Sequence, residues 1–98
     1  MGHSPSFSAY SALPGGDLVA EGLRDLTNGS ETVPAVLVSV GAARLREAGI
    51  EVPTAFSNPE RRLYDLLSRD GDDAAHGRYN ALVRRLISFE HAVECARP

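Results

Sequence analysis

Four polar side chains near the C-terminus have the spacing of one helical stripe and the types needed for chemistry on a phosphate. Arg84, Ser88, His91 and Cys95 are separated by four, three and four residues, so a helix places them on one face. Arginine stabilises the negative charge of a phosphodiester, and imidazole is the side chain best suited to acid–base catalysis near neutral pH. Arg84 and His91 are therefore the catalytic candidates, and the chemistry they indicate is metal-independent cleavage of RNA.

The Arg84-x6-His91 spacing, or Arg85-x5-His91, resembles the short signature of the HEPN ribonucleases and covers eight of the 98 residues. The resemblance implies an all-helical four-helix bundle in which arginine and histidine, often brought together across a dimer, cleave RNA. The chain departs from the signature because Arg85, and not the family's usual polar residue, follows Arg84. The alternative interpretation is a solvated helix face on which His91 lies beside Glu90 and Glu94.

A second nucleic-acid hypothesis treats residues 63–86 as a helix-turn-helix. The segment 69–73 suits the turn, and the following helix has several side chains that could read bases or phosphates. These side chains are Arg78, Asn80, Arg84 and Arg85. DNA phosphates would repel Asp72 and Asp73 at the start of that helix, and the net charge of the chain is -3. Nucleic acid is therefore not the expected partner, and a DNA binder is the second alternative.

No metal or cofactor site is predicted. Asp70, Asp72 and Asp73 lack the alternating positions and closing glutamate of a calcium loop, and they are better explained as the end of one helix and the cap of the next. All ten basic residues are arginines, which excludes the lysine-containing phosphate loop. Cys95 is the only cysteine, so no internal disulfide can form, and a helix C-terminus disfavours its thiolate.

Length and composition predict one small globular domain. The 98 residues are 43% hydrophobic and 23% charged, which leaves no room for a second domain or a large cleft. No apolar run approaches the ~18–20 residues of a membrane span, and residues 1–5 do not resemble a signal peptide. We therefore expect a cytoplasmic protein without membrane contact. The exclusive use of arginine as the basic residue suggests a GC-rich bacterial genome.

Start and stop signals divide residues 17–98 into four expected helices, preceded by an irregular arm at 1–16 that is flexible or pinned to a partner. The expected helices cover about 17–28, 33–48, 59–69 and 73–96. In the first, Asp17 is the expected N-cap, and Gly22 on the buried side predicts a close helix crossing. Asn58 and Pro59 start the third as N-cap and N1 proline.

The second expected helix has a strand alternative at residues 33–40. Val33, Val36, Val38 and Val40 alternate, which suits a strand. A helix is favoured because Pro34 lies where a first turn accepts proline and because no second strand-like run exists to pair with.

The last expected helix is more apolar than one packing seam needs. We expect part of this surface to form a protein interface. The expected interface residues are Tyr79, Val83, Ile87 and Phe89, while Glu90 and Glu94 are expected on a solvated face.

The sequence therefore predicts an all-α, compact four-helix bundle. The expected function is that of a small non-catalytic bacterial interaction or regulatory protein, such as an antitoxin or accessory subunit. It would act through helical contacts with another protein or as a homodimer. The HEPN-like ribonuclease using Arg84 and His91 is the first alternative.

Overall fold

The computed structural model describes residues 12–69 and 71–96 of the chain, and these residues are mostly helical. The helices are α2 (Gly16–Thr27), α3 (Val33–Val40), α4 (Ala42–Glu47), α5 (Pro59–Ser68) and α6 (Asp72–Ala96). No strand occurs in the described ranges, which confirms the all-α class and excludes the strand alternative at 33–40. The predicted arm, 1–16, lies outside the described residues except for 12–15, which form a turn, and Gly16, which is the first residue of α2.

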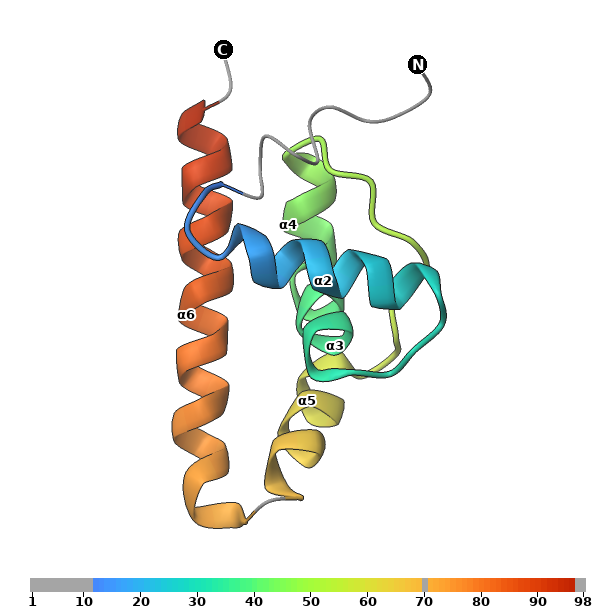
Figure 1. Ribbon diagram of the computed structural model, residues 1–98, viewed down its shortest axis with the longest axis vertical. Helices are drawn as coiled ribbons and strands as arrows, with labels where there is room; N and C mark the ends of the chain where they lie inside the picture. Colours follow the sequence, from blue (N-terminus) through green and yellow to red (C-terminus); the bar gives the residue numbers. More distant parts are fainter. Residues whose placement is uncertain (1–11, 70, 97–98) are drawn as a thin grey trace.

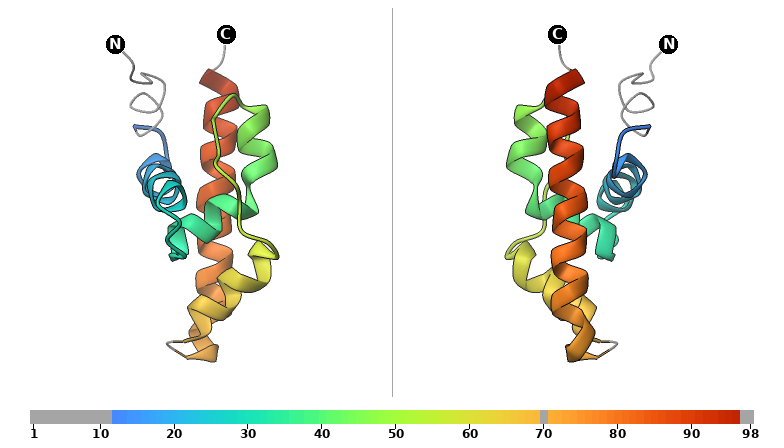
Figure 2. Two further views of the ribbon diagram at one scale, coloured as in Figure 1. Left: turned by 90° about the vertical axis from the view of Figure 1, so that its right-hand side faces the viewer. Right: turned by 90° about the vertical axis from the view of Figure 1, so that its left-hand side faces the viewer.

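The helices are arranged around α6, which runs the length of the molecule (Figure 1). α5 lies beside the first half of α6 and runs in the opposite direction, whereas α2 lies across the molecule in front of α3 (Figures 1 and 2). The four-helix bundle is not confirmed, because the described ranges contain five helices and α2 crosses α6 instead of lying along it.

The expected helix 33–48 is broken at Gly41 into α3 and α4. A Cβ atom at Gly41 would lie 2.8 Å from Glu90 Oε2 and 2.8 Å from Leu86 Cδ2, so close packing against α6 leaves room for hydrogen only. The prediction of one continuous helix was wrong at this point. Its error was to treat Gly41 as an ordinary interior residue, although glycine is the weakest helix former after proline.

At Gly22 the backbones of α2 and α3 come into direct contact. A Cβ atom there would overlap the Pro34 carbonyl oxygen and would lie 2.5 Å from Val38 Cγ2, which confirms the predicted close crossing. The N-cap of α2 is Gly15, with φ 75°, and not Asp17 as expected. Asp17 instead lies in the first turn, where its negative charge suits the helix dipole.

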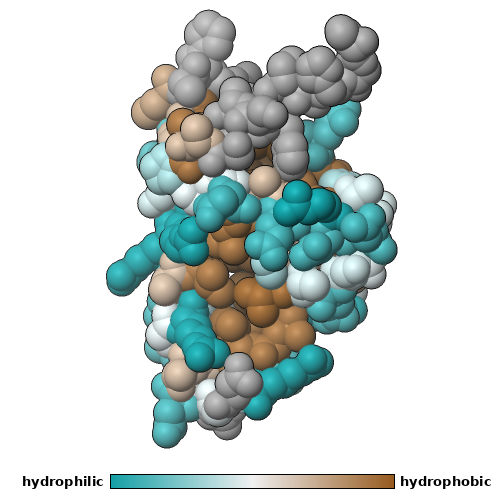
Figure 3. Space-filling view, in the orientation of Figure 1, coloured by the Kyte–Doolittle hydropathy of each residue, from teal (hydrophilic) through white to brown (hydrophobic). Residues whose placement is uncertain are grey.

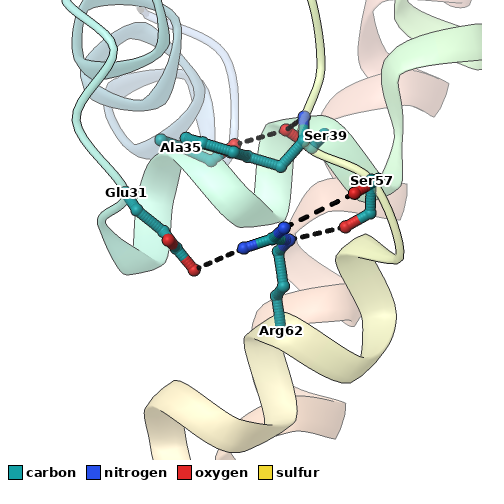
Figure 4. A network of polar contacts seen from close by, with 6 residues as sticks. Glu31, Ala35, Ser39, Ser57 and Arg62 are labelled. Atoms are coloured by element: carbon teal, nitrogen blue, oxygen red, sulfur yellow. Dashed lines mark hydrogen bonds and ion pairs between the residues drawn. The ribbon is translucent and has the colours of Figure 1, made fainter.

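Polar contacts hold the chain around α3. The Thr32 hydroxyl accepts a hydrogen bond from the Ala35 amide (3.2 Å) and donates one to Asp25 Oδ2 of α2 (2.7 Å). Ser39 donates to the Ala35 carbonyl (3.0 Å) and accepts from the Phe56 amide (3.1 Å), which ties the 49–58 connection to α3 (Figure 4).

Arg62 of α5 fixes the start of that helix. Its guanidinium donates to the Ser57 carbonyl (2.6 Å), pairs with Glu31 Oε2 (3.2 Å) and lies 5.6 Å from the centroid of the Phe56 ring (Figure 4). α5 begins at Pro59 as predicted, but Asn58 has φ 47° and makes no side-chain capping bond.

The hydrophobic core lies between α3 and the surrounding helices. Its largest fully buried side chains are Val19, Val36, Leu37, Val38, Leu45, Leu63, Phe89 and Val93. At about 25 cal/mol per Å² of buried apolar surface, these contacts are the main stabilising contribution in a chain without a disulfide.

Candidate functional site

Two ion pairs define two flanks of α6. Arg85 Nη2 lies 3.5 Å from Asp17 Oδ1 of α2, and Glu94 Oε2 lies 3.1 Å from Arg44 Nη2 of α4. Positions 85 and 94 are nine residues, or about two and a half turns, apart, so their side chains point to opposite sides of the helix. We call these opposite sides the α2 flank and the α4 flank of α6.

The α4 flank carries an exposed apolar surface. Ile87 is 45% exposed and Val83, one turn earlier, is partly buried. Tyr79 continues the row, and its ring centroid lies 6.0 Å from that of Tyr64 of α5, which is 37% exposed. Burial raises the pKa of the Tyr79 phenol, and the Glu60 carboxylate raises it further. These four residues, Tyr64, Tyr79, Val83 and Ile87, are called the Ile87 patch.

Three of the four expected interface residues therefore reach the surface, and the fourth does not. Phe89 is 1% exposed and packs in the core, because it lies on the side of α6 that carries Leu86 and Val93. Its position two residues after Ile87 turns it well away from the exposed side. An interface role remains a prediction for Tyr79, Val83 and Ile87.

A second apolar surface lies on the α2 flank and was not predicted. Figure 3 shows it as a hydrophobic area recessed below α2. The partly buried side chains contributed by the surrounding helices are Leu18 of α2, Val33 of α3, Leu66 of α5 and Leu82 of α6. These four residues are called the groove. Sequence patterns mark each as apolar and inward-facing, but they do not show that α2 and α5 leave the space between them open.

Three neighbouring contacts place these side chains on the same side of the molecule. Leu82 precedes Arg85 by three residues, and Leu66 follows Arg62 by four, so each lies near an arginine that reaches toward α2 or the loop after it. Leu18 lies on the side of α2 that carries Asp25, whose carboxylate contacts the residue preceding Val33.

The catalytic candidates Arg84 and His91 lie on the solvent side of α6, away from the core, and both are exposed. Ser88 and Cys95 are exposed on the same stripe, as the spacing predicted. Within one chain the two candidates are separated by about 10.5 Å along the helix axis, at 1.5 Å per residue.

The residues considered for DNA recognition belong to an antiparallel helix pair. α5 and α6 lie side by side (Figures 1 and 2), whereas the two helices of a helix-turn-helix cross at about 90–120°. Arg78, Arg84 and Arg85 are exposed. Arg78 and Arg85 share one face of α6, and Arg84 lies about 100° from Arg85 around the helix. Arg85 contacts Asp17 of α2, which places a carboxylate beside it.

A buried carboxylate is the polar feature that the sequence did not reveal. Glu90 was expected on a solvated face but is 4% exposed, and its Oε2 occupies the space left by the missing side chain of Gly41. Desolvation raises the pKa of Glu90, while the nearby Arg44 guanidinium lowers it. The helical spacing places Glu90 on the buried side of α6, because it follows Leu86 by four residues and precedes Val93 by three, and the missing side chain of Gly41 leaves room for its carboxylate.

Neither a metal site nor a membrane-spanning helix occurs among the described residues. No group of three histidine, cysteine or acidic side chains among the described residues can hold a metal ion, although Asp70 and the Asp72 side chain fall outside that description. In the described ranges, no helix combines the length and apolar character required for a membrane crossing. Comparisons with protein-family models, with curated proteins and with solved structures give no match to this chain.

Proposed function

We propose that this chain is a small non-catalytic interaction or regulatory protein, such as an antitoxin or accessory subunit of the bacterial cytoplasm, that acts through helical protein contacts. The observation that supports this function is the Ile87 patch. Ile87 and Tyr64 are the two large hydrophobic side chains that the described part of the chain leaves more than one-third exposed, and they lie beside Tyr79 and Val83. Contiguous apolar surface of this kind is typical of an interface.

The proposed occupant of the Ile87 patch is a second copy of the chain. A two-fold axis passing between Val83 and Ile87 would run the two α6 helices antiparallel, so that Ile87 of each copy packs against Val83 of the other. The same register places the exposed His76 opposite Glu94, which adds complementary polar contacts at both ends. A stable interface of ordinary size buries about 800 Å² per partner, which requires α5 to contribute through Tyr64.

Light scattering with size-exclusion chromatography tests this proposal. The wild-type protein is expected to be a dimer at micromolar concentration, and Ile87→Asp is expected to be a monomer with an unchanged helical spectrum. Ser88→Asp is the matched control, because it adds the same charge at the adjacent exposed position without removing apolar surface. A wild-type monomer at this concentration, or an Ile87→Asp dimer, would contradict self-association.

The second candidate function is metal-independent RNA cleavage by Arg84 and His91. It is supported by the exposure of both side chains on one solvent-facing stripe. Incubation of labelled RNA with the wild type and with His91→Ala decides it, with Cys95→Ser as a control on the same stripe. Equal rates for wild type and His91→Ala, or no cleavage by either, would remove this candidate. A DNA-binding function is the remaining alternative, and no described feature favours it over these two.

A further inference from the structure

The two helices that border the groove repeat one pattern. α5 and its C-cap residue Arg69 carry Arg62-x3-Leu66-x2-Arg69, and α6 carries Arg78-x3-Leu82-x2-Arg85. At 100° per residue, each set of three lies within an arc of about 60° on its helix. Each helix therefore presents one leucine with an arginine on either side of it along the axis.

The ion pairs show that both arcs face the same way. Arg62 lies 3.2 Å from Glu31, which precedes α3, and Arg85 lies 3.5 Å from Asp17 of α2. Because α5 and α6 are antiparallel (Figure 1), these two arginines lie toward α2, while Arg69 and Arg78 lie toward the α5–α6 connection. The apolar groove in Figure 3 is thus bordered by cationic side chains along both α5 and α6.

Three of these four arginines already have partners within the chain: Arg62 and Arg85 form ion pairs, and Arg78 has a polar or electrostatic contact. The paired side chains are 38% and 40% exposed for Arg62 and Glu31, and 50% and 83% exposed for Arg85 and Asp17. Ion pairs with this exposure contribute little to stability, since water screens them. A carboxylate brought by another molecule can therefore compete with Asp17 for Arg85, whereas Arg62 is also held by two hydrogen bonds to Ser57.

We propose that the groove binds an acidic amphipathic helix of another protein. The apolar residues of that helix would cover Leu66 and Leu82, and aspartate or glutamate residues on its two edges would contact the arginines of α5 and α6. Leucine and valine offer neither stacking surface nor hydrogen bonds to bases, which favours a helical peptide over nucleic acid. This surface is separate from the Ile87 patch, and the proposal does not depend on self-association.

Selection from a displayed library of random peptides of about four helical turns gives the first test. Peptides selected on the wild-type protein are expected to have leucine-type residues at helical spacing between acidic residues. The same selection on Leu82→Asp is expected to enrich none of them. Basic or neutral winners, winners that also bind Leu82→Asp, or a selection without winners would overturn the proposal.

Binding of the best selected peptide, labelled and measured by fluorescence anisotropy, gives the second test. The double variant Arg69→Glu with Arg78→Glu is expected to bind roughly tenfold or more weakly, and the affinity of the wild type should fall as salt rises. The matched control is Arg61→Glu with Arg84→Glu, which makes the same charge changes on the outward faces of α5 and α6. Equal weakening by both double variants would overturn the site.

Two further readouts separate other occupants. Labelled duplex DNA and single-stranded RNA are expected not to compete with the peptide at physiological salt, and competition by either would assign the groove to nucleic acid. Leu82→Asp is expected to keep the oligomeric state of the wild type. A change of oligomeric state in Leu82→Asp, with Ile87→Asp unaffected, would assign the groove to a second copy and overturn the proposal.

Discussion

The contact between α2 and α3 is packed tightly, whereas the two flanks of α6 leave apolar side chains in contact with solvent. At Gly22 the chain removes a side chain so that the helices approach to backbone distance against Pro34. On α6 it leaves Ile87 45% exposed and Leu82 only partly buried. A chain that closes one helix crossing this tightly has the means to cover its apolar side chains, so the open surfaces on α6 require their own explanation. In the two proposals above, protein partners cover these surfaces.

The largest expected effect tests the closed contact. Gly22→Val places a side chain where the Pro34 carbonyl oxygen lies, so α2 must move away from α3. We expect a loss of about 3 kcal/mol or more in the free energy of unfolding, measured by urea denaturation. Gly77→Ala is the matched control, because no atom lies within 4 Å of the added methyl group. It should stabilise α6 by about 0.5–1 kcal/mol. Equal effects of the two substitutions would show that the crossing is not tight.

The next prediction contrasts two side chains on α6. Phe89→Ala removes a core ring that is 1% exposed and should cost about 3–5 kcal/mol of unfolding free energy. Ile87→Ala is measured at a concentration where the protein is monomeric. After correction for the difference in helix propensity between isoleucine and alanine, it should lower the free energy of unfolding by about 0.5 kcal/mol or less. Chemical denaturation of both variants checks this contrast. A large loss for Ile87→Ala in the monomer would mean that Ile87 supports the fold and is not available as interface surface.

A smaller, pH-dependent effect is expected at Glu90. Burial raises the pKa of its carboxyl in the folded protein, although Arg44 opposes this shift. Stability from the protonated carboxyl is fully present below the unfolded-state pKa of about 4.3 and is lost as the pH rises through the higher folded pKa. Glu90→Gln should therefore be more stable than the wild type at neutral pH, with the difference shrinking in acid.

Urea denaturation across this pH range measures the Glu90 effect. Glu51→Gln, which removes an exposed carboxylate that is not among the groups acting on Glu90, is the control for a general effect of charge. A constant difference between Glu90→Gln and the wild type at every pH would show that the carboxyl has no raised pKa.

Local signals in the sequence predict much of this fold, and contacts between distant segments account for the rest. Pro59 starts α5, and the apolar spacing of residues 73–96 predicts α6 as one rod, because both signals act within a few residues. The break at Gly41 depends on how closely α6 approaches, and the burial of Glu90 depends on that break. The break cannot be obtained from the periodicity of one segment, whereas the spacing of Glu90 from Leu86 and Val93 already places it on the inner side of α6.

Of the two candidate surfaces, the Ile87 patch was expected in part from the sequence, whereas the groove was not. The surplus of apolar residues on the last helix favours an interface, and the structure leaves Ile87 exposed and Val83 partly buried against the core. Phe89 was expected among them, but it lies on the buried side of α6 with Leu86 and Val93. The groove requires knowing that α2 and α5 do not meet over Leu66 and Leu82, which no local pattern contains.

The smallest expected effect concerns the pair that borders the groove on the α2 flank. Asp17 and Arg85 are 3.5 Å apart with largely exposed side chains, so a double-mutant cycle of Asp17→Asn and Arg85→Gln should give a coupling energy of about 0.5 kcal/mol or less. Asp17 also interacts favourably with the α2 helix dipole. The double-mutant cycle cancels this interaction, whereas the effect of a single substitution would include it. A weak coupling means that Arg85 can exchange Asp17 for an incoming carboxylate, and Asp17→Asn should then tighten binding of the acidic peptide. A coupling well above 1 kcal/mol would show that the fold itself uses this arginine, which would leave the α2 end of the groove without a cation to offer.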